Sequence, residues 1–348
     1  MSDRAFYERL KDRLERESVV VATITEVIGS APREVGAKMA VCQDGSIIGT
    51  IGGGAGEGKV IERALTVFKT GNKQFVEIDL TGTPEKDIQG VCGGKVRVWL
   101  EKWSKRAISL VEAILELFAT RQSAKLITPF NQNIKPYLIG TQNFSRERDF
   151  WQEIANSPDL QFIETIQPSP ILLIIGGGHV AVSLAQIAHL AGFAIAVQDD
   201  RPQFLTEPRF PQAIWRSPSL TEILAKIVNQ SQLYVALVAR GYQQDIEALQ
   251  ALLQRPLAYQ YIGAIGSQKR IQLIKRELQR QGIPIARLPN FFAPIGLDIG
   301  ALTPEEIAIS ICGELIKVRR GGTGLSLCEQ MQHSQTRSIH HRILHELS

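Results

Sequence analysis

Apolar and polar residues follow two different periods in the first half of the chain. Five β-branched or alternating runs predict strands, at residues 19–25, 38–42, 46–48, 74–80 and 95–101. Three segments have the composition or spacing of helices, at residues 3–17, 59–68 and 106–120. Asp44-Gly45 predicts a hairpin turn between two of the strands. Together these patterns predict an N-terminal α/β domain.

The stretch that follows is less regular. We expect a hairpin near 124–139, a helix near 145–156 and a strand near 161–166. Pro168-Ser169-Pro170 comes next, and prolines so close together stiffen the chain and disfavour helix. The predicted division is therefore an N-terminal domain at 1–167, a second domain at 168–328 and a polar tail at 329–348.

The second domain begins with a continuous apolar run, Ile171-Leu172-Leu173-Ile174-Ile175, which is typical of a strand buried on both faces of a parallel sheet. A glycine-rich turn follows and leads into a helix that we expect to end at Leu190. Further apolar strands are predicted at 194–197, 233–239 and 259–264. Because strands and helices alternate, the sequence predicts a Rossmann-like, doubly wound parallel sheet.

The last helix has a clear start signal. Thr303 is suited to the N-cap, Pro304 to the first helical position, and Glu306 to the third, where its carboxylate closes a capping box. We expect Gly321-Gly322 to end this helix. Its apolar stripe comprises Ile307, Ile311, Leu315 and Val318.

Composition narrows the classes of function. The chain has 348 residues and a net charge of +4, which is too mild for a nucleic-acid surface. It contains no run of about 18 apolar residues, and its charged N-terminus lacks the apolar core of a signal peptide. Its four cysteines form no CxxC pair, and the histidines show no metal-ligand spacing. We expect a cytoplasmic protein without a metal site of its own.

Six glycines fall within residues 49–58. Such a run weakens helices and strands, and its bare N–H groups can form a concavity that binds anions. We therefore predict that Gly52, Gly53, Gly54 and Glu57 line a ligand site. The alternative is a flexible surface loop.

The strongest motif of the second domain is Gly176-x-Gly178-x-x-Ala181, after a buried strand and at the start of a helix. Gly176 permits the tight turn, and Gly178 allows a phosphate to approach the backbone. Asp199 ends the next strand, where an acid accepts hydrogen bonds from a ribose diol. The motif predicts a dinucleotide-type fold.

Other residues near the same sheet edge are further candidates, and four of them have two interpretations each: His179, Arg201, Lys269 and Arg270. His179 either faces the ligand or serves as a capping or solvent-facing residue, and Arg201 either pairs with a ligand phosphate or balances the neighbouring acids. Gly266-Ser267 follows a strand, and Ser267 is suited to cap the next helix and expose N–H groups to a phosphate. Lys269 and Arg270 oppose the helix dipole, so they either attract an anion or are solvated surface cations.

Cys92 lies between small residues, before Gly93-Gly94. Small neighbours can expose the thiol, and nearby N–H groups favour its reactive thiolate form. The alternative is a structural cysteine that acts as a small buried hydrophobe.

In combination, these motifs resemble the XdhC/CoxI family, the accessory factors for xanthine dehydrogenase and related molybdenum hydroxylases. In the first domain the resemblance rests on Gly29-Ser30-Ala31-Pro32-Arg33, Gly49-Thr50-Ile51-Gly52-Gly53-Gly54 with Glu57, and Cys92-Gly93-Gly94. In the second it rests on Gly176-Gly177-Gly178-His179-Val180, Asp199-Asp200-Arg201-Pro202, Gly263-x-x-Gly266-Ser267 and the segment from Pro294 to Ala308. It covers roughly residues 15–325.

The resemblance implies a carrier and chaperone for the molybdenum cofactor (molybdopterin). Such a protein holds the pterin, supports replacement of an oxo ligand by a sulfido ligand through a cysteine desulfurase, and passes the cofactor to an apo-hydroxylase. We expect the loops Gly52–Glu57 and Cys92–Gly94 and the carboxyl edge of the second sheet to hold it, with Cys92 facing the metal or its sulfur. Gly176–His179 and Gly266–Ser267 would bind phosphate, and Asp199 a ribose or pterin edge.

Two positions depart from the family pattern. Ala55 stands where members often have cysteine, and Tyr242 stands where many have histidine. Two other functions stay open: an NAD(P)-dependent oxidoreductase, and a scaffold that joins a desulfurase to the hydroxylase without binding cofactor. The expected partners are the apo-hydroxylase and the desulfurase, with neither nucleic acid nor membrane, and a homodimer is the expected assembly.

Overall fold

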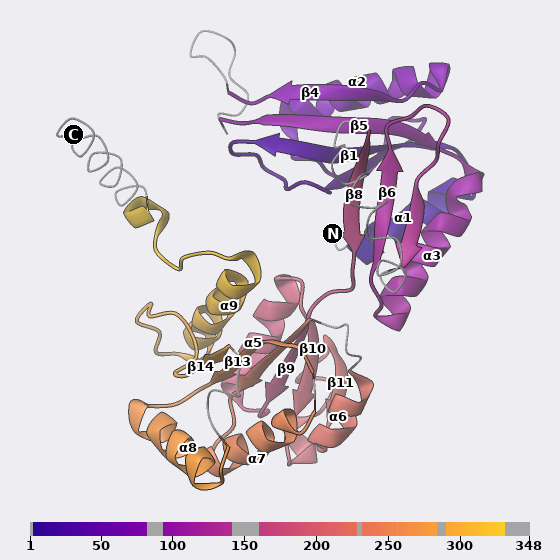
Figure 1. Ribbon diagram of the computed structural model, residues 1–348. Helices are drawn as coiled ribbons and strands as arrows, with labels where there is room; N and C mark the ends of the chain where they lie inside the picture. Colours follow the sequence, from indigo (N-terminus) through magenta and orange to yellow (C-terminus); the bar gives the residue numbers. More distant parts are fainter. Residues whose placement is uncertain are drawn as a thin grey trace, which may run out of the picture. The chain divides into compact units, whose positions relative to one another are not determined.

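The computed structural model describes residues 3–81, 93–140, 160–227, 232–255, 257–283 and 290–330. The chain divides into two units, Met1–Pro168 and Ser169–Ser348 (Figure 1). The expected helix near 145–156, Cys92 and most of the polar tail lie outside the described residues. No helix in the described ranges is long and apolar enough to cross a membrane.

The first unit is built on an antiparallel sheet with the strand order β3-β2-β1-β5-β4. Its strands match the predicted runs: β1 (Val19–Ile28), β2 (Lys38–Val41), β3 (Ile47–Gly49), β4 (Gln74–Asp79) and β5 (Lys95–Trp103). Successive residues of β1 point to opposite faces, so the sheet has two apolar sides. Val20 and Ala22 pack on the side of α2 (Gly54–Thr70), and Val19 and Val21 on the side of α1 (Asp3–Leu14) and α3 (Ile108–Thr120), which η1 (Lys105–Ala107) precedes.

A second, smaller sheet completes this unit. It contains β6 (Ala124–Pro129), β7 (Tyr137–Gly140) and β8 (Gln161–Ile166), in the order β7-β6-β8. The predicted hairpin and the strand near 161–166 are therefore confirmed. Leu126 and Ile166 are buried in the same apolar cluster as α1 and α3, which ties this sheet to the first one.

The second unit is a six-stranded sheet with the order β11-β10-β9-β12-β13-β14, all of its neighbouring strands being parallel. Its strands are β9 (Ile171–Ile175), β10 (Ala194–Gln198), β11 (Ala213–Ser217), β12 (Leu233–Leu237), β13 (Tyr259–Ala264) and β14 (Phe291–Phe292). β9 is buried along its whole length. The predicted doubly wound, Rossmann-like architecture is confirmed.

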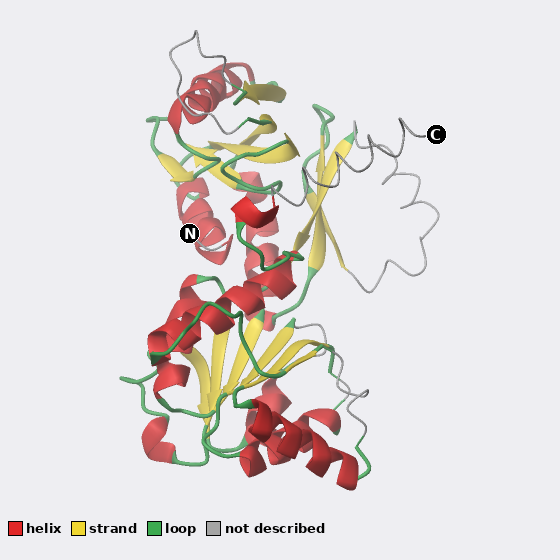
Figure 2. Cartoon of the chain, turned by 90° about the vertical axis from the view of Figure 1, so that its left-hand side faces the viewer, coloured by secondary structure: helices red, strands yellow, loops and turns green. Residues whose placement is uncertain are grey.

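Helices cover both faces of this sheet (Figure 2). On one face α5 (His179–Leu190) and α9 (Pro304–Arg320) pack against Leu172 and Ile174 of β9. On the other, α6 (Leu220–Lys226), α7 (Tyr242–Leu253) and α8 (Gln268–Arg280) pack against Leu173. The short helix η3 (Pro202–Phe204) follows β10. Since β10 and β12 flank β9 on opposite sides, the crevice of the fold opens at the carboxyl end of β9.

The start of α9 is the one that the sequence predicts. Thr303 Oγ1 accepts a hydrogen bond from the Glu306 backbone N–H at 3.3 Å, and the Glu306 carboxylate accepts one from the Thr303 N–H at 3.0 Å. Pro304 occupies the first helical position, and Gly321 ends the helix in the left-handed conformation. The capping box and the glycine stop are both confirmed.

Candidate functional site

Three glycine-containing motifs of the first unit meet at the turn Gly29–Arg33. Gly52 lies against Pro32 of this turn, and a Cβ added to it would lie 2.4 Å from Pro32 Cγ. Gly94 lies against the same turn, and a Cβ there would lie 2.3 Å from the Ser30 carbonyl oxygen. The structure therefore places the turn, the glycine-rich segment and Gly93-Gly94 side by side.

Glu57 organises the glycine-rich segment. Its Oε2 accepts hydrogen bonds from Thr50 Oγ1 at 2.6 Å and from the backbone N–H groups of Gly53 at 3.2 Å and Ile51 at 3.3 Å. The sequence predicts the helix from Lys59 onward, but α2 begins at Gly54. The reason is local: a carboxylate beside the free N–H groups stabilises a helix start, and this offsets the low helix propensity of glycine.

Of the predicted Cys92–Gly94 loop, the structure describes Gly93 and Gly94. Gly93 donates a hydrogen bond to the Leu80 carbonyl at 3.1 Å, and the Gly94 carbonyl accepts one from the Leu80 N–H at 2.8 Å. These bonds extend the pairing of β4 with β5 and hold Gly93-Gly94 beside the turn. Cys92 lies outside the described residues, so its role stays a prediction. Ala55 is exposed in the first turn of α2.

The second unit contains a cavity of about 610 Å³ at the carboxyl edge of its sheet. The turn after β9, the end of β10, the segment after β12, the segment after β13 and one side of α7 line it. Its walls bring together seven residues that the sequence singles out: Gly176, Gly178, His179, Asp199, Arg201, Gly266 and Arg270. Ser267 instead caps α8, since its side chain accepts a hydrogen bond from the Arg270 N–H at 3.4 Å.

The turn after β9 has the geometry that an anion needs. Gly176 has a φ of +112°, and a Cβ there would lie 2.7 Å from the Val238 carbonyl oxygen, so a larger residue does not fit. At Gly178 an added Cβ would meet no atom within 4 Å, which shows that this backbone faces open space. Because α5 begins at the next residue, its free N–H groups border the cavity.

Asp199 is engaged by the protein itself. Its Oδ2 accepts hydrogen bonds from the Gly177 N–H at 2.7 Å and Arg201 Nη2 at 2.9 Å, and its Oδ1 accepts two from the Arg201 N–H and Nε, both at 2.9 Å. Burial opposes ionisation, but these hydrogen bonds and the guanidinium charge outweigh it and lower the pKa of Asp199 below its usual range. A ribose diol could reach these oxygens only by displacing Arg201.

Arg201 thus balances the acids, one of the two interpretations that the sequence leaves open. Its guanidinium also lies 3.8 Å from the centre of the Phe204 ring, a cation–π contact that fixes it further. Bound bidentately to Asp199, it is a structural part of the cavity wall.

Arg270 forms a buried ion pair that neither interpretation of the sequence includes. Its Nε and Nη2 donate to Asp245 Oδ2 at 3.0 and 2.5 Å, and Nη2 also donates to the Ala239 carbonyl at 2.9 Å. Asp245 is fully buried, which raises its pKa to about 6 although the guanidinium opposes the shift. Within the described part of the chain, Arg270 Nη1 has no hydrogen-bond partner. Arg270 therefore offers the cavity an anchored cation.

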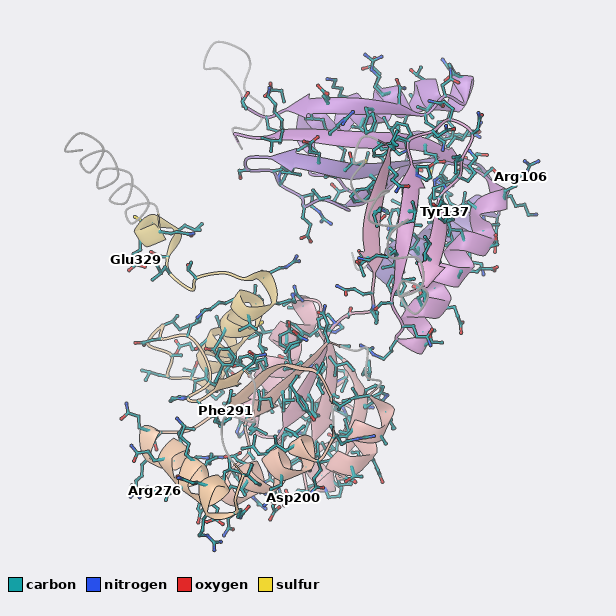
Figure 3. The ribbon with its side chains drawn as sticks, viewed as in Figure 1. Arg106, Tyr137, Asp200, Arg276, Phe291 and Glu329 are labelled. Atoms are coloured by element: carbon teal, nitrogen blue, oxygen red, sulfur yellow. The ribbon has the colours of Figure 1, made fainter. Side chains whose placement is uncertain are left out.

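Asp200, which Figure 3 labels, lines the cavity and bonds two other residues of its wall. Its Oδ2 accepts hydrogen bonds from Arg240 Nη2 at 3.1 Å and Gln244 Nε2 at 3.2 Å. Sequence reasoning gave no role to Arg240, Gln244 or Asp245. The position of Arg240 could have been predicted, because this residue follows a predicted strand and so belongs at the same sheet edge as Asp200.

Comparison with known proteins finds a family match in each of the two units. A family model described as the XdhC Rossmann domain matches residues 172–315, and one described as the XdhC and CoxI family matches residues 13–79. Together the two matches take in more than half of the chain.

Individual relatives extend along most of the chain. It is 29% identical to a probable xanthine dehydrogenase subunit from Bacillus subtilis, over 90% of this chain and 98% of that protein. It is 25% identical to the molybdenum cofactor insertion chaperone PaoD of Escherichia coli, over 87% of this chain and 84% of that protein. It is also 27% identical to the Escherichia coli protein YqeB, of which it spans only 47%.

A solved structure shares the fold. The crystal structure of a protein described as a xanthine dehydrogenase from Bacillus halodurans superposes with a TM-score of 0.75 at 27% sequence identity. The match covers 92% of this chain and 96% of that one, so it includes both units.

Proposed function

The chain belongs to the XdhC and CoxI family, and from this membership we propose that it is an accessory protein of a xanthine dehydrogenase-type molybdenum hydroxylase. In this proposal it binds the molybdenum cofactor as cargo and delivers it to the apo-hydroxylase. Its relative PaoD is a molybdenum cofactor insertion chaperone, which supports this role.

The cavity of the second unit is the observation that carries the proposal. A pterin cofactor ends in a phosphate, and the cavity joins the open backbone at Gly178, the start of α5 and the anchored guanidinium of Arg270. Backbone N–H groups and a fixed arginine are the donors that phosphate recognition uses. We propose that Gly176–His179 and Arg270 hold the phosphate end. The bound molybdenum centre supplies the redox chemistry of the hydroxylase.

Two finer parts of the proposal concern the first unit. We propose that the Gly29–Arg33 turn, Gly52–Glu57 and Gly93-Gly94 line a ligand site within the first unit, since these motifs meet in one place. Support for sulfuration by a cysteine desulfurase, with Cys92 near the metal or its sulfur, is a further expectation from the family resemblance.

The geometry lends less support to an NAD(P)-dependent oxidoreductase. That function would use Asp199 to hold a ribose, and four protein hydrogen bonds already engage the Asp199 carboxylate. A pure scaffold would not need an open cavity bordered by a glycine turn and an anchored arginine. Cofactor carriage accounts for both features.

Gly178→Val tests the proposal without disturbing the fold. Gly178 has a φ of −72°, which any residue adopts, and the new side chain would project into open space. It would block the backbone from the phosphate, so we expect hydroxylase activation to fall at least about tenfold, the loss of a few kcal/mol of charge-assisted hydrogen bonding. The measurement is activation of a partner apo-hydroxylase by the purified, cofactor-loaded protein.

Gly140→Val is the matched control, because a Cβ at Gly140 in β7 also meets no atom within 4 Å. We expect this variant to activate the hydroxylase like the unaltered protein. Full activation by Gly178→Val would contradict the proposed phosphate site.

A further inference from the structure

Asp199 occupies the position where a dinucleotide-binding fold holds the ribose of its ligand. It follows β10 directly, and its Oδ2 accepts a hydrogen bond from the Gly177 N–H at 2.7 Å, so the carboxylate faces the glycine turn after β9. In folds of this class, an acid at the end of the second strand accepts hydrogen bonds from the ribose hydroxyls. The state of this carboxylate therefore decides whether the cavity can hold a riboside.

The protein itself occupies every acceptor position of this carboxylate. The two oxygens of an ionised carboxylate offer about four lone pairs. The Gly177 N–H and Arg201 Nη2 bind Oδ2, and the Arg201 N–H and Nε bind Oδ1. Asp199 is only 4% exposed, so a ligand cannot approach either oxygen from another side.

The side chain of Arg201 is responsible for half of these hydrogen bonds. It supplies one to each oxygen, and the other two come from backbone N–H groups, which any residue except proline would provide at position 201. Without the guanidinium, each oxygen would keep one backbone hydrogen bond and regain one acceptor position. Two free acceptor positions are what the two hydroxyls of a ribose require.

Arg201 is held firmly over Asp199. Its guanidinium carbon lies 3.8 Å from the centre of the Phe204 ring in η3, on which it packs. A guanidinium that binds both oxygens of a carboxylate forms stronger and more specific hydrogen bonds than neutral groups do. A riboside would have to break this pair, so the pair raises the free energy of binding for ribosides in particular.

The other walls of the cavity do not depend on Asp199. The phosphate donors proposed above are the backbone at Gly178 and the guanidinium of Arg270, and neither belongs to the Asp199–Arg201 pair. Leu220 and Val238 add apolar lining, against which a flat ring can pack. A ligand with a ring and a phosphate but no ribose therefore keeps these contacts, whereas a dinucleotide loses the anchor of its ribose.

We propose that Arg201 determines which ligands the cavity accepts: by occupying Asp199 it excludes ribose-containing dinucleotides such as NADH and leaves the cavity to a phosphate ligand without a ribose. The identity of the accepted ligand rests on the proposed function, since molybdopterin contains no ribose. The exclusion of ribosides depends on the Asp199–Arg201 pair alone. One arginine thus distinguishes this site from a dinucleotide site of the same fold.

Fluorescence titration of the purified full-length protein with NADH tests the exclusion. We expect Arg201→Ala to bind NADH at least about thirtyfold more tightly than the original protein, because the ribose gains two charge-assisted hydrogen bonds to Asp199. Arg201→Met should show the same gain, since its side chain can still pack on Phe204 and donates no hydrogen bond. Circular dichroism of each variant verifies that it is folded.

Arg240→Ala is the matched control. It removes an equal charge from the wall of the same cavity, but it leaves the four hydrogen bonds of Asp199 in place, so we expect no gain in NADH affinity. Asp199→Ala added to Arg201→Ala should return the NADH affinity to within about threefold of the original, because the acceptors of the ribose are then absent. A purely structural role for Arg201 would produce neither the gain nor its reversal.

Three results would overturn the role of Arg201: an original protein that binds NADH as tightly as Arg201→Ala, folded Arg201→Ala and Arg201→Met that gain no affinity, or a double variant that keeps the gain. The molybdopterin content of the original protein separates this inference from the proposed function. Molybdopterin without any gain in NADH affinity would overturn the role of Arg201 and leave cofactor carriage standing. A gain in NADH affinity without molybdopterin would support the exclusion of ribosides and contradict cofactor carriage.

Discussion

At the scale of single residues, Arg270 serves both the fold and the cavity. It neutralises the fully buried Asp245 and fixes the Ala239 carbonyl, while Nη1 lacks a partner in the described part of the chain. A charge fixed before the ligand arrives loses little side-chain freedom on binding. The ion pair therefore holds the Arg270 side chain in place. Loss of this side chain should both destabilise the fold and weaken anion binding in the cavity.

Arg270→Ala should destabilise the second unit in a pH-dependent way. Removing one partner of a buried pair costs about 3–5 kcal/mol, because the remaining charge is buried alone. Burial already raises the pKa of Asp245 to about 6, and loss of the guanidinium should raise it further. A folded-state pKa above the unfolded value means that stability is higher at low pH and falls as pH rises through the folded pKa.

We therefore expect the loss of unfolding free energy to be large at pH 8 and smaller at pH 5, as measured by urea denaturation. Arg276→Ala is the control, since Arg276 lies on the same helix (Figure 3) and makes no ion pair among the described residues. A pH-independent loss, or an equal loss in the control, would contradict this account of the pair.

At the scale of elements, local sequence signals fix where the helices begin. Thr303→Ala should remove one arm of the capping box of α9 and lower the free energy of unfolding by about 1 kcal/mol. Thr221→Ala is the control, because Thr221 lies in α6 and its side chain has no partner within the described residues. Urea denaturation of both variants makes the comparison, and equal losses would argue against the capping role.

Whether a helix start depends on neighbouring residues or on a more distant contact explains which starts could be predicted from the sequence. The start of α9 was predictable because the residues that form it, Thr303 to Glu306, are neighbours in the chain. The start of α2 was placed too late, because the propensity of Gly54–Gly58 is poor and the hydrogen bonds of Glu57 to the loop were not foreseen. Where a contact between loop and helix overrides propensity, the pattern of residue types alone is insufficient.

Contacts between residues far apart in the sequence were also difficult to predict. The glycine turn and Asp199 were found because the fold class places both at one sheet edge. The Arg270–Asp245 pair was missed because its partners are 25 positions apart and lie on two different helices. The engagement of Asp199 by Arg201 was left as one of two alternatives, since spacing cannot distinguish a ligand contact from an internal ion pair.

At the scale of the whole molecule, each unit brings its own motifs together. In the first, the Gly29–Arg33 turn meets the glycine-rich segment and Gly93-Gly94. In the second, the switch in strand order opens a cavity at the end of β9. Both arrangements suit the binding of a ligand.

Cofactor carriage is tested most directly on protein purified from cells that make the molybdenum cofactor. Molybdenum would be quantified by elemental mass spectrometry and oxidised pterin by fluorescence in the same sample. We predict matched amounts of the two, close to one per chain. Absence of both, in a preparation where an established molybdopterin-binding protein retains its cofactor, would contradict cofactor carriage.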